Sequence, residues 1–169
     1  MSIAVRTLAA LLMASLASSV AAAAQDIAII TNPAVRAESI EFDDLRSLFL
    51  GERKFWDPGS PVRLAFQKDE TKVSERFLST VCAMTARAHR RYWLKRIFQG
   101  HSSSPYVAQS PDVLFEYLER TPGAIGYVLM DEDLERRAQA GGIVILAVEG
   151  KLPNEQEYPL TLSAAGRRR

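Results

Sequence analysis

The sequence contains very little cysteine, since Cys82 is the single one among 169 residues. One thiol cannot form a disulfide within the chain, so the fold must be stabilised by a buried core. Cys82 also lies too far along the chain to be the acylated first residue of a lipoprotein. We therefore expect a protein that is neither cross-linked nor lipid-anchored.

Net charge is also nearly absent, at +1 for the whole chain. No global field would therefore draw the protein to nucleic acid or to anionic lipid, and we expect no nucleic-acid partner. Positive charge is concentrated locally, in the predicted helix that holds Arg87 to Arg96. This cluster could meet an acidic partner or a membrane surface, or it could be an ordinary solvated helix face.

The histidines, His89 and His101, have no metal-ligand spacing with Cys82. No nucleophile elbow, zinc-binding helix or nucleotide-type glycine loop is present either. We therefore predict a protein that is not an enzyme and that holds no metal or cofactor. His89 lies among arginines, and this pattern predicts a surface position.

Long apolar runs are lacking as well, because the longest, Leu8 to Val20, is well short of the about 20 residues that a spanning helix needs. Arg6 precedes this run and the small residues Ala21 to Ala24 follow it, which is the layout of a cleaved secretory signal peptide. We predict a signal peptide over residues 1–24, export to the periplasm, and a single domain over residues 25–169. Prolines and the terminal arginines predict a frayed C-terminal tail after the last strand.

Alternating strand and helix patterns fill the remaining sequence. Predicted strands cover Ile27–Thr31, Val62–Phe66, Ala124–Met130 and Gly142–Val148. Predicted helices cover Phe42–Phe49, Glu70–Cys82, a segment from the cap Thr85 to Phe98, a segment starting at Ser110-Pro111-Asp112, and Asp131–Gln139. Because each strand needs a crossover to reach a parallel neighbour, the order predicts an α/β layered domain with a mostly parallel sheet flanked by helices.

The most suggestive polar residues lie where the second predicted strand meets its helix. Helix-start amides, hydroxyl groups and a cation can together hold an anion, and this stretch supplies them. The candidate ligand-binding residues here are Gln67, Lys68, Asp69, Thr71 and Ser74. The alternative is that Asp69 caps the helix and Lys68 is merely solvated.

Asp69 bears on which anion could bind. A carboxylate beside an oxyanion is costly unless the ligand carries a proton to donate, as hydrogen phosphate does and sulfate does not. The neighbouring Glu70 would weaken the binding of any anion.

Thr31 and Asn32 follow the first predicted strand and are the second group of candidates. Ligands of open α/β sheets collect outside the carboxyl ends of strands, so these residues could join the same site. An Asx turn before Pro33 is the alternative explanation.

Several motifs, taken in order, resemble the substrate-binding subunit of phosphate ABC importers. They are Leu48 to Gly51, Trp56, Gly59, Phe77, Tyr92-Trp93, Phe98, Gly100 and Pro122-Gly123-Ala124-Ile125-Gly126-Tyr127. The resemblance implies a periplasmic-binding-protein-like fold of one lobe, because the family's members have two lobes and this chain is about half their size. It also implies inorganic phosphate or a similar oxyanion as ligand, and an ABC importer or another exported or membrane protein as partner.

The family's phosphate loop reads arginine, any residue, aspartate, glycine, serine, glycine, threonine at a helix start. In this sequence Asp69 matches and Thr71 can replace the serine, whereas Gln67 stands at the arginine position and Lys72 at a glycine position. Gln67 and Lys72 favour the alternative function, an exported protein-protein interaction domain that keeps the fold without binding a ligand.

Overall fold

The computed structural model describes residues 25–57, 59–68, 71–100 and 104–162. The predicted signal peptide, Asp69, Glu70 and the terminal arginines lie outside these residues. Within the described part, no helix has the length and apolar character that crossing a membrane requires. The same residues contain no cluster of three or more His, Cys, Asp or Glu side chains able to hold a metal ion.

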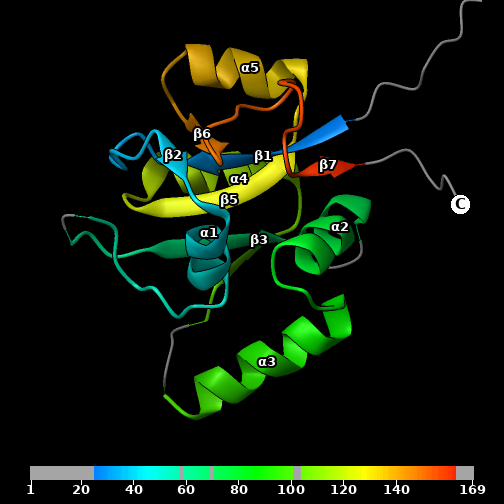
Figure 1. Ribbon diagram of the computed structural model, residues 1–169. Helices are drawn as coiled ribbons and strands as arrows, with labels where there is room; N and C mark the ends of the chain where they lie inside the picture. The colour runs from blue at the N-terminus through cyan, green and yellow to red at the C-terminus, as the bar shows by residue number, and fades with distance from the viewer. Residues whose placement is uncertain (1–24, 58, 69–70, 101–103, 163–169) are drawn as a thin grey trace, which may run out of the picture.

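Helices and strands alternate along most of the chain (Figure 1). In chain order the elements are β1 (Gln25–Thr31), β2 (Ser39–Ile40), α1 (Phe42–Phe49), β3 (Arg63–Gln67), α2 (Lys72–Thr80), α3 (Ala86–Phe98), β4 (Tyr106–Ala108), α4 (Pro111–Arg120), β5 (Ala124–Leu129), α5 (Glu132–Gln139), β6 (Val144–Val148) and β7 (Thr161–Leu162). The predicted helices and longer strands are confirmed within a few residues at their ends. The short strands β2, β4 and β7 were not predicted.

Side-chain caps fix where the helices begin. The hydroxyl of Thr85 accepts a hydrogen bond from Ala88 N, and Ser110 accepts one from Val113 N. Such caps satisfy N–H groups that the first turn of a helix leaves without an intrahelical partner. Both caps were predicted from the sequence, as was the favourable Pro111 in the first turn of α4.

The described strands form one seven-stranded sheet in which the order is β2-β6-β1-β5-β3-β4, with β7 added to β1. Strand β1 is antiparallel to β5, β6 and β7, whereas β3 is parallel to β4 and β5, and β2 is parallel to β6. The sheet is therefore mixed, and the prediction that it is mostly parallel was wrong. The reason is that no crossover helix links β1 to a parallel neighbour: its neighbours come from much later in the chain.

Helices cover both faces of the sheet, with α1 and α2 in front of it and α4 behind it in Figure 1. The central strand β1 alternates between the two cores, because Ile27 and Ile29 pack with α1, α2 and α3 while Ala28 and Ile30 pack with α4 and α5. This period of two is what a strand buried on both faces requires. The arrangement is an α/β lobe with one mixed sheet between two helical layers.

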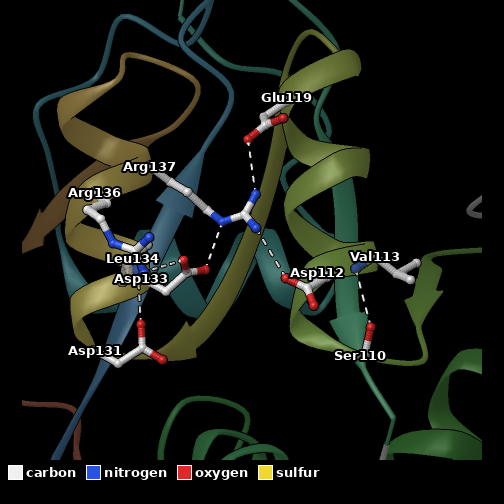
Figure 2. Close-up of polar contacts among 9 residues, drawn as sticks. All are labelled: Ser110, Asp112, Val113, Glu119, Asp131, Asp133, Leu134, Arg136 and Arg137. Carbon is white, nitrogen blue, oxygen red and sulfur yellow. Dashed lines mark hydrogen bonds and ion pairs between the residues drawn. The ribbon is translucent and has the colours of Figure 1, made fainter.

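On the rear face, α4 and α5 are joined by one arginine (Figure 2). Arg137 contacts Asp133 in its own helix at 2.9 Å, Asp112 at 3.1 Å and Glu119 at 3.6 Å, the last two in α4. The hydrogen bond from Arg137, together with its charge, holds the pKa of the Asp133 carboxyl below its usual value. Because these groups are partly exposed, the cluster orients α5 more than it stabilises the fold.

The segment after β6 packs against the sheet as far as the structure describes it. Tyr158 is buried and its hydroxyl donates to the carbonyl of Ile27 at 2.9 Å. Leu160 is also buried, and β7 pairs with the start of β1. A frayed tail was expected here; the part up to Leu162 is ordered by these contacts, and residues 163–169 lie outside the described residues.

His89 is buried, so the prediction of a surface position was wrong. Its Nε2 accepts a hydrogen bond of 2.9 Å from Trp93 Nε1, and its ring lies 4.8 Å from that of Phe66. His89 and Trp93 are one helical turn apart on the face of α3 that turns toward the core, while the neighbouring arginines occupy the other face. His89 thus has a structural role in attaching α3.

Cys82 offers a direct check of the core. It is 3% exposed, and burial raises the pKa of its thiol to about 12. At about pH 8 roughly one thiol in ten thousand would then be ionised, and the thiolate is the reactive form. We expect the folded protein to react very slowly with Ellman's reagent and the unfolded protein in guanidinium chloride to react at once. Rapid reaction of one thiol in the folded protein would contradict this burial.

Candidate functional site

The predicted site begins where β3 ends, at the carboxyl edge of the sheet. Gln67, the last residue of β3, is buried, and its Nε2 donates to the carbonyl of Tyr127 at 2.8 Å. The next residue, Lys68, is exposed and its backbone N–H donates to Ala108 O in β4 at 3.1 Å. Gln67 therefore ties β3 to β5 by its side chain, and Lys68 extends the pairing of β3 with β4.

Ser74 lies in the first turn of α2 and is fully buried. Its hydroxyl donates to Lys68 O at 3.0 Å and accepts from the Tyr127 hydroxyl at 3.0 Å. The Tyr127 ring in turn stacks on Phe77 of α2, with the ring centroids 3.8 Å apart. These contacts fasten the start of α2 to β5 and to the end of β3.

Thr71 precedes α2 and caps it, because its Oγ1 accepts a hydrogen bond of 3.0 Å from Ser74 N. The Thr71 hydroxyl still has its own hydrogen to donate. Lys72 is exposed in the first turn, so two lysines, at positions 68 and 72, flank this helix start. Asp69, which was also predicted here, lies outside the described residues.

Thr31 and Asn32 lie at the other end of the sheet from Gln67 and Lys68. In the register of the sheet, Thr31 pairs with Ile125 of β5, and Ile125 pairs with Leu64 of β3. Gln67 is then about 10 Å further along β3, at about 3.3 Å per residue. Because β1 is antiparallel to β5, its carboxyl end meets the amino ends of β3 and β5. The structure therefore does not bring the two groups of predicted residues together.

Asn32 forms an Asx turn, which was the alternative to a ligand-binding role for this residue. Its Oδ1 accepts from Ala34 N at 2.8 Å, and its Nδ2 donates to Leu118 O at 2.7 Å and to Glu119 O at 3.1 Å. Asn32 thus attaches the end of α4 to the end of β1. Thr31 is fully buried, and its Oγ1 has no hydrogen-bond partner among the described residues.

A groove of about 510 Å³ opens at the amino end of β3, away from the predicted loop. Its lining includes the exposed cations Lys54 and Arg63. Tyr106 and Tyr117 also line it, and their rings are stacked 4.0 Å apart. Burial raises the pKa of the Tyr117 phenol, and the charge of Arg63 opposes this effect. Sequence reasoning missed this groove because its residues come from distant parts of the chain.

Sequence reasoning also missed Tyr127 as a neighbour of the predicted loop. The available signal was the motif Pro122-Gly123-Ala124-Ile125-Gly126-Tyr127, which ends on this residue. The parallel pairing of β3 with β5 is what brings Tyr127 beside Gln67. That pairing cannot be deduced from either segment alone.

This mixed sheet between helical layers is a periplasmic-binding-protein-like fold of one lobe. Three solved structures share it: PstS from Borrelia burgdorferi, a protein assigned as a phosphate ABC transporter substrate-binding protein, with bound phosphate, from Clostridium perfringens, and an ABC-type phosphate transport receptor from Vibrio cholerae. Their TM-scores are 0.62, 0.62 and 0.58, at sequence identities of 15%, 12% and 11%. These identities are low, so the likeness establishes the fold.

The matches cover 82%, 82% and 78% of this chain, but only 55%, 53% and 49% of the solved chains. This chain therefore spans about half the length of the structures that it resembles. Neither a protein-family model nor a curated protein matches the sequence.

Proposed function

We propose that this protein is an exported, non-catalytic solute-binding domain that holds phosphate or a similar oxyanion at the carboxyl end of β3. The observation that carries the proposal is the start of α2: it directly follows β3, is capped by Thr71 and is flanked by Lys68 and Lys72. Helix starts attract anions through their N–H groups and the helix dipole. The likeness to a fold that holds phosphate in the Clostridium structure supports this choice of ligand.

In this proposal the ligand contacts come from a few groups at the start of α2. The Thr71 hydroxyl and the first-turn amides of α2 other than Ser74 N, which donates to Thr71 Oγ1, donate hydrogen bonds to the ligand, and the Lys68 ammonium supplies charge. Lys72 stands where the related loop has a glycine, and its ammonium adds a second cation. Asp69 would accept the proton of hydrogen phosphate and so disfavour sulfate.

Gln67 and Ser74 act as positioning residues in this proposal. The Gln67 amide donates to Tyr127, and the Ser74 hydroxyl donates to Lys68 O. Both side chains are buried, so they fasten the end of β3 and the start of α2 to the domain and are not among the proposed ligand contacts. Thr31 and Asn32, at the opposite end of the sheet, stay outside the proposed contact set.

The cellular setting is part of the proposal. The segment Leu8 to Val20 supports export to the periplasm, where a single lobe could deliver its ligand to an ABC importer. Two of the similar structures are described as parts of phosphate ABC transport, which supports such a partner. A two-lobed receptor closes on its ligand from both sides, so we expect this lobe by itself to bind more weakly.

A second candidate function is an exported interaction domain that keeps the fold without a ligand. The observation that favours it is the internal use of the Gln67 and Ser74 donors, which leaves fewer groups for an anion. The two candidates differ in one measurable respect, since only the first predicts that phosphate stabilises the folded protein.

Thermal unfolding with phosphate separates the candidates. We would use the chain from Gln25, which contains every helix, strand and core residue that the structure describes. A ligand at 100 times its Kd stabilises the fold by about 2.7 kcal/mol, which raises Tm by roughly 5 to 10 °C. We expect this rise with phosphate and arsenate and a smaller one with sulfate. No rise with phosphate would favour the second candidate.

Two variants test where phosphate binds. Thr71→Val and Lys68→Ala should each reduce the phosphate-dependent rise in Tm by half or more. The matched control is Thr85→Val, because Thr85 caps α3 in the same way that Thr71 caps α2. Both valine variants lose about 1 kcal/mol of helix-cap stability, so only their response to phosphate should differ. An undiminished rise in Thr71→Val and Lys68→Ala would mean that phosphate binds elsewhere.

A further inference from the structure

Helix α3 carries a cationic face that the proposed oxyanion site does not use. The helix contains no aspartate or glutamate. Its exposed residues recur at steps of three and four, which places them on one side of the helix. They are Arg87, Arg90, Arg91, Leu94, Lys95 and Phe98, which together we term the α3 face.

The opposite side of α3 is fastened to the domain, so the α3 face has a fixed direction. Trp93 and His89 are buried against the core. The Tyr92 hydroxyl donates to Leu50 O at 2.8 Å, and Arg96 Nη2 donates to Gly51 O at 2.8 Å. The helix cannot rotate to hide the α3 face without breaking these contacts.

Two large apolar side chains lie among the cations. Leu94 is 50% exposed and Phe98 is 87% exposed, and they are neighbours one helical turn apart. A helix face that serves only for solubility normally carries acidic residues as well, as α5 does: there Asp133 pairs with Arg136 and Arg137. The α3 face instead combines one sign of charge with exposed apolar groups.

Lysine and arginine together with exposed leucine and phenylalanine are residue types that also occur in helices lying at a membrane interface. Each lysine or arginine near an anionic lipid surface contributes about 1 kcal/mol of attraction, while leucine and phenylalanine enter the boundary of the acyl chains. Helix α3 forms the lower border of the molecule in Figure 1, with α2 between it and β7. It is about 20 Å long, at about 1.5 Å per residue.

We propose that the α3 face binds the surface of an anionic lipid bilayer. The bilayer is the occupant that the structure favours, because an anionic lipid surface accepts both the positive charge of the α3 face and its exposed apolar pair. A purely acidic polypeptide would match the charge but not the exposed Leu94 and Phe98. The inference is independent of phosphate binding, since none of the residues in the α3 face belongs to the proposed oxyanion site.

Co-sedimentation with lipid vesicles tests the proposal. The chain from Gln25 would be used, so that the apolar segment Leu8 to Val20 cannot insert by itself. We expect binding to vesicles of equal parts phosphatidylglycerol and phosphatidylcholine, weakening as salt is added, and little binding to pure phosphatidylcholine. Equal binding to the neutral vesicles, or none to the anionic ones, would overturn the proposal.

Two variants separate the α3 face from general charge. Arg91→Glu/Lys95→Glu should weaken binding to the anionic vesicles at least roughly tenfold. The control Arg36→Glu/Arg120→Glu changes net charge equally at exposed positions outside α3, and should bind nearly as the parent does. Equal loss in both variants would show that only net charge matters and would overturn the proposal.

Two further measurements test the role of Leu94 and Phe98 and distinguish a lipid partner from an acidic polypeptide. Leu94→Ser/Phe98→Ser should weaken binding severalfold while keeping its salt dependence, because the cations remain. Unchanged binding in this variant would contradict interfacial insertion. Binding to poly-glutamate in the absence of binding to vesicles would identify an acidic polypeptide as the partner instead and overturn the lipid assignment.

Discussion

Replacing Gly123 by alanine is expected to destabilise the fold by about 3 to 5 kcal/mol, from a left-handed backbone with a Cβ and from overpacking. Gly123 has a φ of +80°, and a Cβ at this position would lie 2.2 Å from the carbonyl oxygen of Pro61. The neighbouring contacts are tight because Gly123 O accepts from Trp56 Nε1 at 2.9 Å and from Arg63 N at 3.0 Å. Thermal unfolding should show Tm lowered by roughly 6 to 20 °C.

Gly141→Ala is the matched control for this variant. Gly141 has nearly the same φ, +78°, but a Cβ there would meet nothing within 4 Å. It should therefore cost only the backbone strain, about 1 to 2 kcal/mol. If the two variants lowered Tm equally, the close approach of Gly123 to Pro61 would contribute nothing to the loss of stability, which would contradict this prediction.

Asn32→Ala is expected to destabilise the fold by about 2 to 4 kcal/mol. Asn32 is 5% exposed, and its side chain makes three hydrogen bonds, two of them to carbonyls at the end of α4. Removing the side chain leaves buried polar groups unsatisfied, at about 1 to 3 kcal/mol each. Chemical denaturation should show a lower free energy of unfolding.

Asn32→Asp sharpens the test, because it keeps the acceptor for Ala34 N but turns an oxygen toward the carbonyls of Leu118 and Glu119. It should therefore be at least as destabilising as Asn32→Ala. The exposed Gln99, changed to alanine, serves as the control and should have little effect. A stable Asn32→Ala protein that responded less to phosphate would instead show that Asn32 is a ligand-binding residue.

Local patterns in the sequence were sufficient to predict most of the elements. The caps Thr85 and Ser110, and apolar residues at three- and four-residue steps, act within one turn of chain and do not depend on the rest of the fold. Strands β2 and β7 have two residues each, too few for any periodicity to be visible. Their pairing is set by β6 and β1, which are distant in the sequence.

Strand direction was the main feature that local patterns could not provide. A buried strand such as β1 has the same run of apolar residues whether its neighbours are parallel or antiparallel. The direction of β1 determined which of the predicted site residues lie together in the structure. Residues within the stretch from Gln67 to Ser74 lie together because the chain itself connects them, whereas Thr31 and Asn32 were assigned to the site through an assumed strand direction.

His89 shows a similar limit for side chains. Its neighbours in the sequence are arginines, but its position on α3 turns it toward Phe66 and Trp93. Which side of a helix is buried depends on where the helix attaches, and the mean composition of α3 is too polar to reveal this. The buried imidazole accepts the indole N–H of Trp93, a contact that could be found only in three dimensions.

The central position of β1 also determines when the chain can fold during its synthesis. The strand that leaves the ribosome first in this domain pairs with residues 125–129, 144–146 and 161–162, all from the far end of the chain. Such distant pairings must wait until residues 125–162 have been synthesised, and contacts of this range slow folding. Until then Ile29 and Ile30 have no partner strands, so the nascent chain exposes an unpaired hydrophobic strand that is prone to aggregation and that chaperones can bind. For the same reason, a chain truncated before β5 cannot complete the sheet around β1.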